Sequence, residues 1–280
     1  GDRVFEGKRK EGFDEKRAEN LLKTQERLSE ETGVPGMADI VANTGKEFKQ
    51  FIDFVTSASS MPFCIDAWVM KPKLEGAAYC AEKGLLDRMF YNSLTIWEKD
   101  LETEIREISQ IGVKHVLLVA FDQEDQMPGG RITGTQKLLD AIEKAGAEFE
   151  SIFVDTSVMN GPATAFCGVA NKMIKEKWGF PTASAPSNGS YMDLQRFKDM
   201  WDFKGWSATD AALEAIAAFH YHDMIFSGPM AGATRILPAV AEAEAYLATA
   251  AFAETKQLPQ DPDHPLFKLF PDFVDQLKTL

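Results

Sequence analysis

The sequence predicts an α/β protein, with an eight-stranded (β/α)8 TIM-type barrel as the favoured architecture. Seven short apolar or β-branched runs recur at intervals of roughly 26 to 44 residues, which is the spacing of βα units. Each run is followed by a segment with helical periodicity, and no hairpin signal joins two neighbouring runs. The length of 280 residues suits one large α/β domain. A doubly wound open sheet is the alternative arrangement of the same units.

The predicted strands fall one short of a closed barrel. Phe13–Glu31 already resembles the first crossover helix, so we expect the eighth strand to be upstream of Gly1. The seven predicted strands are Gly36–Ala42, Pro62–Trp68, Arg88–Leu94, His115–Asp122, Ser151–Val158, Phe180–Asn188 and Met224–Met230.

Amphipathic helices are predicted between these strands, and several carry end signals. Thr44 is placed to cap one helix at its start. Gly33, Gly112 and Gly146 follow helices where a left-handed residue commonly ends them. The helices expected are Asp14–Glu31, Lys46–Ser57, Asp100–Ile111, Thr135–Ala145, Ala163–Trp178 and Thr234–Lys256.

The chain divides into residues 1–257, which form the barrel, and residues 258–280, which form a C-terminal tail. The tail begins with a Pro-rich turn at Leu258–Pro265 and continues with apolar residues at helical spacing. Such a stripe needs a surface to cover. We expect it to close the bottom of the barrel, with a subunit interface as the alternative. The stripe consists of Leu266, Phe267, Phe270, Phe273, Val274 and Leu277.

Composition excludes several classes of function. Lys plus Arg is 30 against 43 for Asp plus Glu, a net charge of −13, which argues against binding nucleic acid or an anionic membrane surface. The longest compact apolar run, Val116–Phe121, has the length of a strand, so we expect no membrane insertion. The charged first residues lack the apolar stretch of a signal peptide. Three scattered cysteines suit a reducing compartment, so a cytoplasmic location is expected.

Polar side chains recur at the ends of the predicted strands, where a barrel of this type builds its active site. Several of these carboxylates and amides stand within apolar runs, and such groups are costly to bury unless they pair with a partner or a ligand. We therefore expect a binding site there. Its candidates are Asp39, Asp66, Asn92, Asp122, Asp155 and Asn188, with Ser187 beside the last.

These candidates are acceptors and amides, which suit a neutral heterocycle with several N–H donors. A carboxylate can accept two parallel N–H bonds from an amino-pyrimidinone edge, as it does from a guanidinium group. The sequence has no phosphate-binding P-loop, and GGRITG at 129–134 is too loose for a dinucleotide fingerprint. His220 and His222 precede a strand and are expected to be structural, and Cys64, Cys80 and Cys167 are expected to fill the core. No metal site is predicted.

Nearly the whole chain, from about Gly12 to Phe270, resembles the H subunit of tetrahydromethanopterin S-methyltransferase and its bacterial relatives. The similarity to methyltetrahydrofolate:corrinoid methyltransferases is more remote. The order and spacing of the matching stretches are specific, although no single stretch is diagnostic. These are GFDEKRAENLLKTQERLSEETG, PFCIDA, LLDRMFYNSL, VLLVAFD, FVDTSV, KEKWGFPTASAPSN, SGPM and HPLFKLF.

The resemblance implies a barrel that binds a methylated tetrahydropterin and exchanges its methyl group with the cobalt of a separate corrinoid protein. It implies methyl-tetrahydrofolate or tetrahydrofolate as the substrate if the source is a bacterium, cobalamin carried by the partner protein, and a homodimer. The family's pterin-binding carboxylates fall on Asp66 and Asp155, and its amides on Asn92 and Asn188; Asp39 matches a further acidic position and Ser187 adjoins the site. The implied catalytic residues are Asn92, Asp155 and Asn188: Asn92 or Asn188 hydrogen-bonds at the reacting ring nitrogen, and Asp155 holds the pyrimidinone edge together with Asp66.

Three alternatives stay open from the sequence. A dihydropteroate synthase-like pterin enzyme would need basic residues for a pyrophosphate leaving group, and these are not evident. A non-catalytic barrel subunit could instead organise a methyltransferase complex, in which case Asp66, Asn92 and Asp155 would be locked in protein contacts with no pocket above them. A metal-dependent hydrolase fits least, because carboxylates with poorly placed histidines make a weak divalent site.

Overall fold

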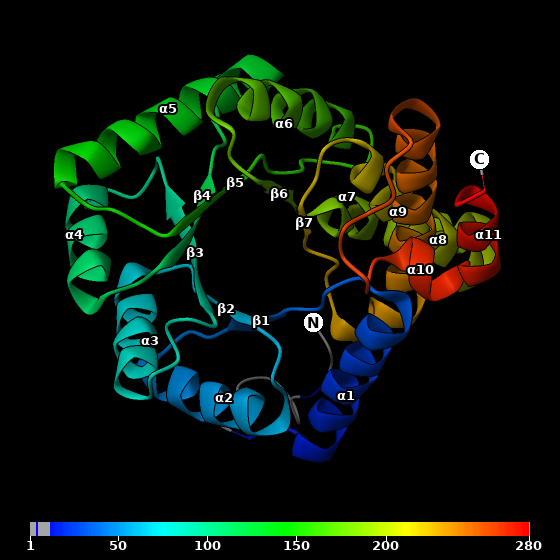
Figure 1. The fold of residues 1–280 in the computed structure, drawn as a ribbon. Helices are drawn as coiled ribbons and strands as arrows, with labels where there is room; N and C mark the ends of the chain where they lie inside the picture. Colours follow the sequence, from blue (N-terminus) through cyan, green and yellow to red (C-terminus); the bar gives the residue numbers. More distant parts are fainter. Residues whose placement is uncertain (1–3, 5–11, 280) are drawn as a thin grey trace.

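The computed structural model describes residues 4 and 12–279, in which seven parallel strands form a curved sheet surrounded by helices (Figure 1). The strand order follows the chain from β1 to β7, so each strand pairs with its neighbours in sequence, as in a (β/α) barrel. A doubly wound sheet reverses its strand order at a switch point, so that alternative is wrong. The strands are β1 (Ala38–Val41), β2 (Phe63–Asp66), β3 (Met89–Thr95), β4 (His115–Val119), β5 (Ser151–Asp155), β6 (Thr182–Ser184) and β7 (Met224–Ile225).

Helices follow the strands and cover the outer face of the sheet (Figure 1). The helices before β6 are α1 (Glu15–Thr32), α2 (Gly45–Ala58), α3 (Met70–Glu82), α4 (Leu101–Ile111), α5 (Pro128–Ala145) and α6 (Thr164–Trp178). Those after β6 are α7 (Pro186–Met192), α8 (Leu194–Phe219), the 3-10 turn η1 (Met230–Gly232), α9 (Ala233–Thr255), α10 (Pro265–Leu269) and α11 (Pro271–Leu277).

The predicted helix ends are confirmed. The Thr44 side chain accepts a hydrogen bond from the Glu47 backbone N–H at 3.2 Å and caps α2. Gly33, Gly112 and Gly146 end α1, α4 and α5 with φ values of 77°, 87° and 66°, a conformation that glycine adopts without steric cost.

Two of the predicted strands run into the helices that follow them. The run Phe180–Asn188 contains a strand only at β6, because Pro186 begins α7 and proline is favoured in the first turn of a helix. The run Met224–Met230 likewise contains only the two-residue β7, and Met230 begins η1. Ser187 and Asn188 therefore lie on a short helix after the strand and not on the strand itself.

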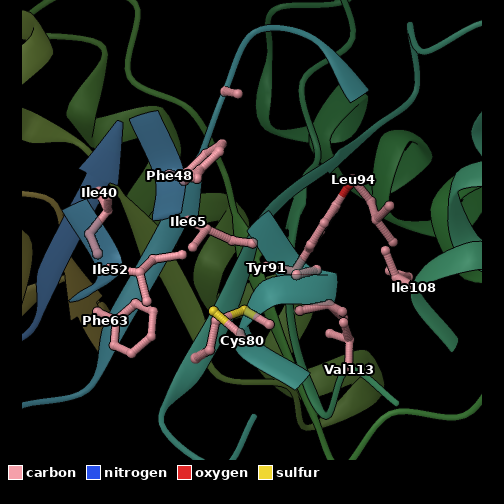
Figure 2. Packing of buried hydrophobic residues seen from close by; sticks show 14 of the residues in the cluster. Ile40, Phe48, Ile52, Phe63, Ile65, Cys80, Tyr91, Leu94, Ile108 and Val113 are labelled. Carbon is pink, nitrogen blue, oxygen red and sulfur yellow. The ribbon is translucent and has the colours of Figure 1, made fainter. Parts of the chain in front are cut away.

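The hydrophobic core lies between the sheet and helices α2 to α5. Alternate strand residues such as Ile65 and Tyr91 point outward and lie among helix residues such as Ile52 and Cys80 (Figure 2). Cys64, Cys80 and Cys167 are all buried and unpaired. The other alternate residues point into the barrel, so the same strands that build the core also carry the site.

The C-terminal tail packs on the outside of the barrel beside α9 (Figure 1). Leu266, Val274 and Leu277 bury against Phe252 and Ala245 of α9, whereas Phe273 stays 40% exposed. Within the part of the chain described, most of the predicted apolar stripe therefore packs against α9 of the same chain. The division of the chain into a barrel and a tail stays a prediction, and so does the homodimer.

One helical stretch, Met230–Thr255, is long and apolar enough to cross a membrane by length and composition. It packs against α8, α1 and α10 as part of the helical layer. The prediction of no membrane insertion rested on continuous apolar runs and did not consider this Ala-rich helix, so it stays a prediction. Of the N-terminal charged segment, residues 1–3 and 5–11 lie outside the part of the chain described.

Candidate active site at the carboxyl ends of the strands

The interior of the barrel holds a cavity of about 1230 Å³. Its walls include every residue predicted to bind the pterin, although these come from several different βα units. The cavity also reaches the start of the strands, where Pro35, Pro62 and Pro265 line it. The site residues that share the cavity are Asp39, Asp66, Asn92, Asp155, Ser187 and Asn188.

Sheet register aligns Asp66 at the end of β2 with Asn92 of β3, and it places Asp39 of β1 opposite Cys64, two residues before Asp66. The Asn92 side-chain amide donates a hydrogen bond to the Asp39 carboxylate at 3.4 Å. Asp39, Asp66 and Asn92 are called the β1–β3 wall below.

The two carboxylates on this wall, Asp39 and Asp66, both have raised pKa values. Asp39 opens onto the cavity but is enclosed by the barrel, and this enclosure together with the Asp66 charge raises the pKa of Asp39 to about 7. Burial also raises the pKa of Asp66, while the Lys73 ammonium group opposes that shift. At neutral pH Asp39 therefore exchanges a proton readily.

Asp155 faces the same cavity from the end of β5. Its carboxylate accepts a hydrogen bond from the Ser157 backbone N–H at 2.7 Å. Burial raises the pKa of Asp155 to about 6, and the Ser157 N–H and the Arg131 guanidinium both limit the rise. Asp155 is thus mostly ionised at neutral pH and positioned to accept hydrogen bonds.

Arg131 supports the site from behind the cavity and was not among the predicted residues. It is fully buried, and its guanidinium donates to the backbone carbonyls of Thr156, Ser157 and Gln126. These bonds clamp the loop that follows Asp155 to the start of α5. In the sequence, Arg131 stands within GGRITG at 129–134, a motif too loose for a dinucleotide fingerprint. Its glycines serve packing instead, because a Cβ on Gly130 would lie 1.9 Å from the Asp125 carbonyl oxygen.

Ser187 and Asn188 enter the cavity from α7. The Ser187 hydroxyl donates to the Phe226 carbonyl at 2.7 Å and so ties α7 to the end of β7. Asn188 is exposed at the cavity wall. Asp155, Ser187 and Asn188 are called the β5–α7 wall below.

A buried polar cluster holds α7 in place. Ser190 donates to the Asp210 carboxylate, and the Arg235 guanidinium donates to the same group at 2.7 Å. The Trp206 indole N–H donates to the Ser190 carbonyl at 3.0 Å, and Arg235 stacks 4.9 Å from the centre of the Trp206 ring. α8 and α9 thus determine where Asn188 lies.

Asp122 is the one strand-end candidate that lies outside the cavity. Val119 and Phe121 line the cavity, so the alternation of a strand turns Asp122 the other way. Its carboxylate binds Lys137 at 3.1 Å and the Glu124 backbone N–H at 3.0 Å, which hold its pKa below the ordinary value.

The histidines have structural surroundings. His222 is buried with Nδ1 2.7 Å from the Ala217 carbonyl oxygen, and burial lowers its pKa to about 4. Within the part of the chain that the structure describes, no group of three or more His, Cys, Asp or Glu side chains is arranged to hold a metal ion.

Known proteins resemble this chain both in sequence and in fold. The H subunit of tetrahydromethanopterin S-methyltransferase from Methanothermobacter thermautotrophicus is 29% identical over 96% of this chain and 88% of its own. The H subunit of the same name from Methanopyrus kandleri is 27% identical over 95% and 87%. Among solved structures, Xanthomonas albilineans dihydropteroate synthase with 4-aminobenzoic acid superposes with a TM-score of 0.57 at 14% identity, covering 87% of this chain and 88% of that one.

The dihydropteroate synthase likeness supports the barrel fold alone, because the identity is low. Sequence carries the family assignment: the model for the tetrahydromethanopterin S-methyltransferase MtrH subunit matches residues 1–257. The chain belongs to the MtrH subunit family of tetrahydromethanopterin S-methyltransferase.

Proposed function

We propose that the chain transfers a methyl group between the ring nitrogen of a tetrahydropterin and the cobalt of a corrinoid carried by a partner protein. The observation that carries this proposal is the meeting of Asp66, Asn92 and Asp155 at one cavity. A scaffold without chemistry would instead lock these groups in protein contacts. The family name indicates the class of reaction, methyl transfer, and the cavity is large enough to be the site where the pterin binds.

Asp66 and Asp155 bind the pyrimidinone edge of the pterin. Both are acceptors at the ends of strands, and an amino-pyrimidinone offers the N–H donors that match them. Each hydrogen bond to an ionised carboxylate contributes about 1.5–3 kcal/mol. Tetrahydrofolate and tetrahydromethanopterin are both tetrahydropterins, so this recognition accepts either; tetrahydrofolate is the substrate the sequence favours, and tetrahydromethanopterin is the one in the relatives' name.

The charge of the cavity disfavours the dihydropteroate synthase alternative. Among the described residues that line it, Lys73 is the one Lys or Arg, whereas the carboxylates include Asp39, Asp66, Glu104 and Asp155. A pyrophosphate leaving group would meet a negative wall with one buried cation. A neutral or protonated pterin suits the same wall.

Methyl transfer here is a single displacement without a covalent enzyme intermediate. The bond between the ring nitrogen and the methyl carbon breaks as a carbon–cobalt bond forms with the electron pair of reduced cobalt. The ring nitrogen keeps the electron pair of the broken bond and takes a proton, and the reverse reaction releases that proton. Asn92 or Asn188 hydrogen-bonds to this nitrogen. Asp39, with a pKa of about 7 and a hydrogen bond from Asn92, is suited to exchange the proton.

The rim of the cavity is suited to a protein partner. Exposed apolar side chains stand in the loops that follow four successive strands and on α7, all at the face where the strands end. A patch of this kind beside a site indicates a protein interface, and a corrinoid protein docked there would present its cobalt to the cavity. The protein is expected to act in the cytoplasm, as a homodimer. The rim residues are Trp68, Val69, Trp97, Met127, Met159 and Met192.

The test is methyl transfer to free cob(I)alamin, followed by the absorbance of methylcobalamin. Methyl-tetrahydrofolate and methyl-tetrahydromethanopterin are each offered as donor. Asp155→Asn should lower kcat/KM at least a hundredfold, because it removes an acceptor charge from the pterin edge. Asp122→Asn changes a strand-end carboxylate outside the cavity and should leave the rate unchanged. Equal rates in both variants, or no transfer from either donor, would contradict the proposal.

A further inference from the structure

A buried charged cluster lies directly behind the β1–β3 wall. It consists of Lys73 from α3, Glu104 from α4 and Tyr91 from β3, with exposed fractions of 6%, 1% and 0%. The Lys73 ammonium nitrogen lies 3.0 Å from the Glu104 carboxylate and 4.8 Å from the centre of the Tyr91 ring. The Tyr91 hydroxyl donates to the same Glu104 oxygen at 2.5 Å.

Lys73 also contacts the strand that carries Asn92. Its ammonium group donates a hydrogen bond to the Ser93 carbonyl oxygen at 2.6 Å. Ser93 follows Asn92 at the point where the register of β3 against β4 shifts by one residue. The ladder is interrupted at this bulge, so the bond from Lys73 supplies a contact that fixes the backbone beside Asn92.

Stability alone gives a poor account of this cluster. A buried ion pair is often no more stable than apolar residues of the same size, because both charges lose their hydration. Lys73 and Glu104 also border the cavity together with Asp66. The charge of Lys73 therefore lies beside the part of the cavity in which a molecule bound to Asp66 would lie.

The charges around Asp66 are unbalanced without Lys73. Asp39 faces it from β1 and Asp155 from β5, and both interact with Asp66 as like charges. Glu104 on α4 stands behind Lys73 and partly offsets its charge. Arg131 lies behind Asp155 on the other side of the barrel. Among the described residues, Lys73 is the one Lys or Arg that lines the cavity with Asp66, and its charge opposes the rise in the pKa of Asp66.

We propose that Lys73 is a positioning residue for the pterin: it fixes Asn92 through the Ser93 carbonyl and supplies the positive charge that matches the Asp66 carboxylate. This inference rests on the proposed function, in which Asp66 and Asn92 contact the pterin. Glu104 and Tyr91 hold the ammonium group in place. The pKa of Asp66, which burial raises and Lys73 opposes, is consistent with this role.

The experiment measures methyl-tetrahydrofolate affinity from pH 5 to pH 8 by calorimetry for three variants. Lys73→Met removes the charge and leaves Glu104 buried without its partner. Lys73→Met combined with Glu104→Gln removes both charges and keeps an acceptor for Tyr91, so it preserves the fold if the single variant does not. Lys73→Arg keeps the charge. Thermal unfolding accompanies each titration.

We expect Lys73→Met and the double variant to bind at least tenfold more weakly at pH 7. Their loss of affinity on acidification should begin at a higher pH than in the wild type, because Asp66 is then protonated more easily. The double variant should regain the unfolding temperature without regaining affinity, and Lys73→Arg should stay within about threefold of wild type. A folded double variant with wild-type affinity and pH dependence would overturn the inference.

A pterin-independent readout separates this inference from the proposed function. The ¹³C signal of the Asp66 carboxyl, assigned by its loss in Asp66→Asn, is titrated in the free protein. Its pKa should rise in the double variant, and an unchanged pKa would overturn the electrostatic part of the inference. Wild-type protein that is folded but binds neither methyl-tetrahydrofolate nor methyl-tetrahydromethanopterin would overturn the proposed function instead.

Discussion

The two walls of the cavity carry the same kinds of side chain but are held by different means. On the β1–β3 wall, sheet register aligns Asp66 with Asn92 on strands of four and seven residues. On the β5–α7 wall, β6 has three residues and β7 two, so the sheet positions little beyond Asp155. There, side chains from outer helices do the positioning: Arg131 clamps the loop after Asp155, and Asp210 with Arg235 holds α7.

This difference shows how one barrel can fix a site from local strand geometry on one side and from tertiary contacts on the other. Substitutions in outer helices should accordingly disturb the β5–α7 wall and spare the β1–β3 wall. Lys73 is the exception, because it connects an outer helix to the β1–β3 wall. The following predictions test that contrast.

The largest effect is expected for Arg131→Met. The change leaves the backbone carbonyls of Thr156, Ser157 and Gln126 without their charged donor, and Thr156 is fully buried. Since hydrogen bonds to a charged group contribute about 1.5–3 kcal/mol each, we expect the free energy of unfolding to fall by at least about 4 kcal/mol. Urea denaturation followed by circular dichroism measures it. Thr133→Val, on the exposed side of α5, serves as the control. One such hydrogen bond contributes more than about 1 kcal/mol. If Arg131→Met lowers the free energy of unfolding by less than that, Arg131 does not clamp the loop.

A smaller effect is expected for Asp210→Asn. Arg235 then loses its buried partner, which costs about 3 kcal/mol, at the low end for a broken buried pair. The consequence should be local: hydrogen–deuterium exchange should accelerate over residues 186–192 and stay unchanged over 63–66. The affinity for the methyl-pterin should fall about tenfold, because a loosened α7 no longer holds Asn188 in place. Equal acceleration of both segments would mean that the two walls do not differ in the way described.

The same contrast explains what could be predicted from sequence. Asp66, Asn92 and Asp155 were predicted because each stands at or near the end of an apolar run, a local pattern that strand geometry turns into a position. Thr44 and Gly33 were predicted for the same reason, since caps depend on neighbouring residues. Asp122 follows β4 by three residues, and because Val119 and Phe121 both line the cavity, the next residue is expected to point away from it.

The β5–α7 wall was predicted less well because its determinants are distant in sequence. Pro186 was a local sign that a helix begins there, yet Phe180–Asn188 was read as one strand. Nothing local marks Arg131 or Lys73 as buried, because each lies on a helix and its burial depends on the strands that it meets. Because charged residues on helices are usually exposed, the sequence predicts solvent-exposed side chains for Arg131 and Lys73, and both are buried in the structure.

The most direct test of the account is calorimetric titration of the wild-type protein with methyl-tetrahydrofolate and methyl-tetrahydromethanopterin, beside Asp66→Asn and Asp155→Asn. We expect micromolar binding of one pterin at pH 7, weakened at least tenfold, or about 1.4 kcal/mol, in each variant. Since the pKa of Asp155 is about 6 and only its ionised form accepts the pterin hydrogen bonds, wild-type affinity should fall as the pH drops below 6, and this loss should be smaller in Asp155→Asn. Asp122→Asn should bind as wild type does. Binding that survives both site substitutions would contradict the account.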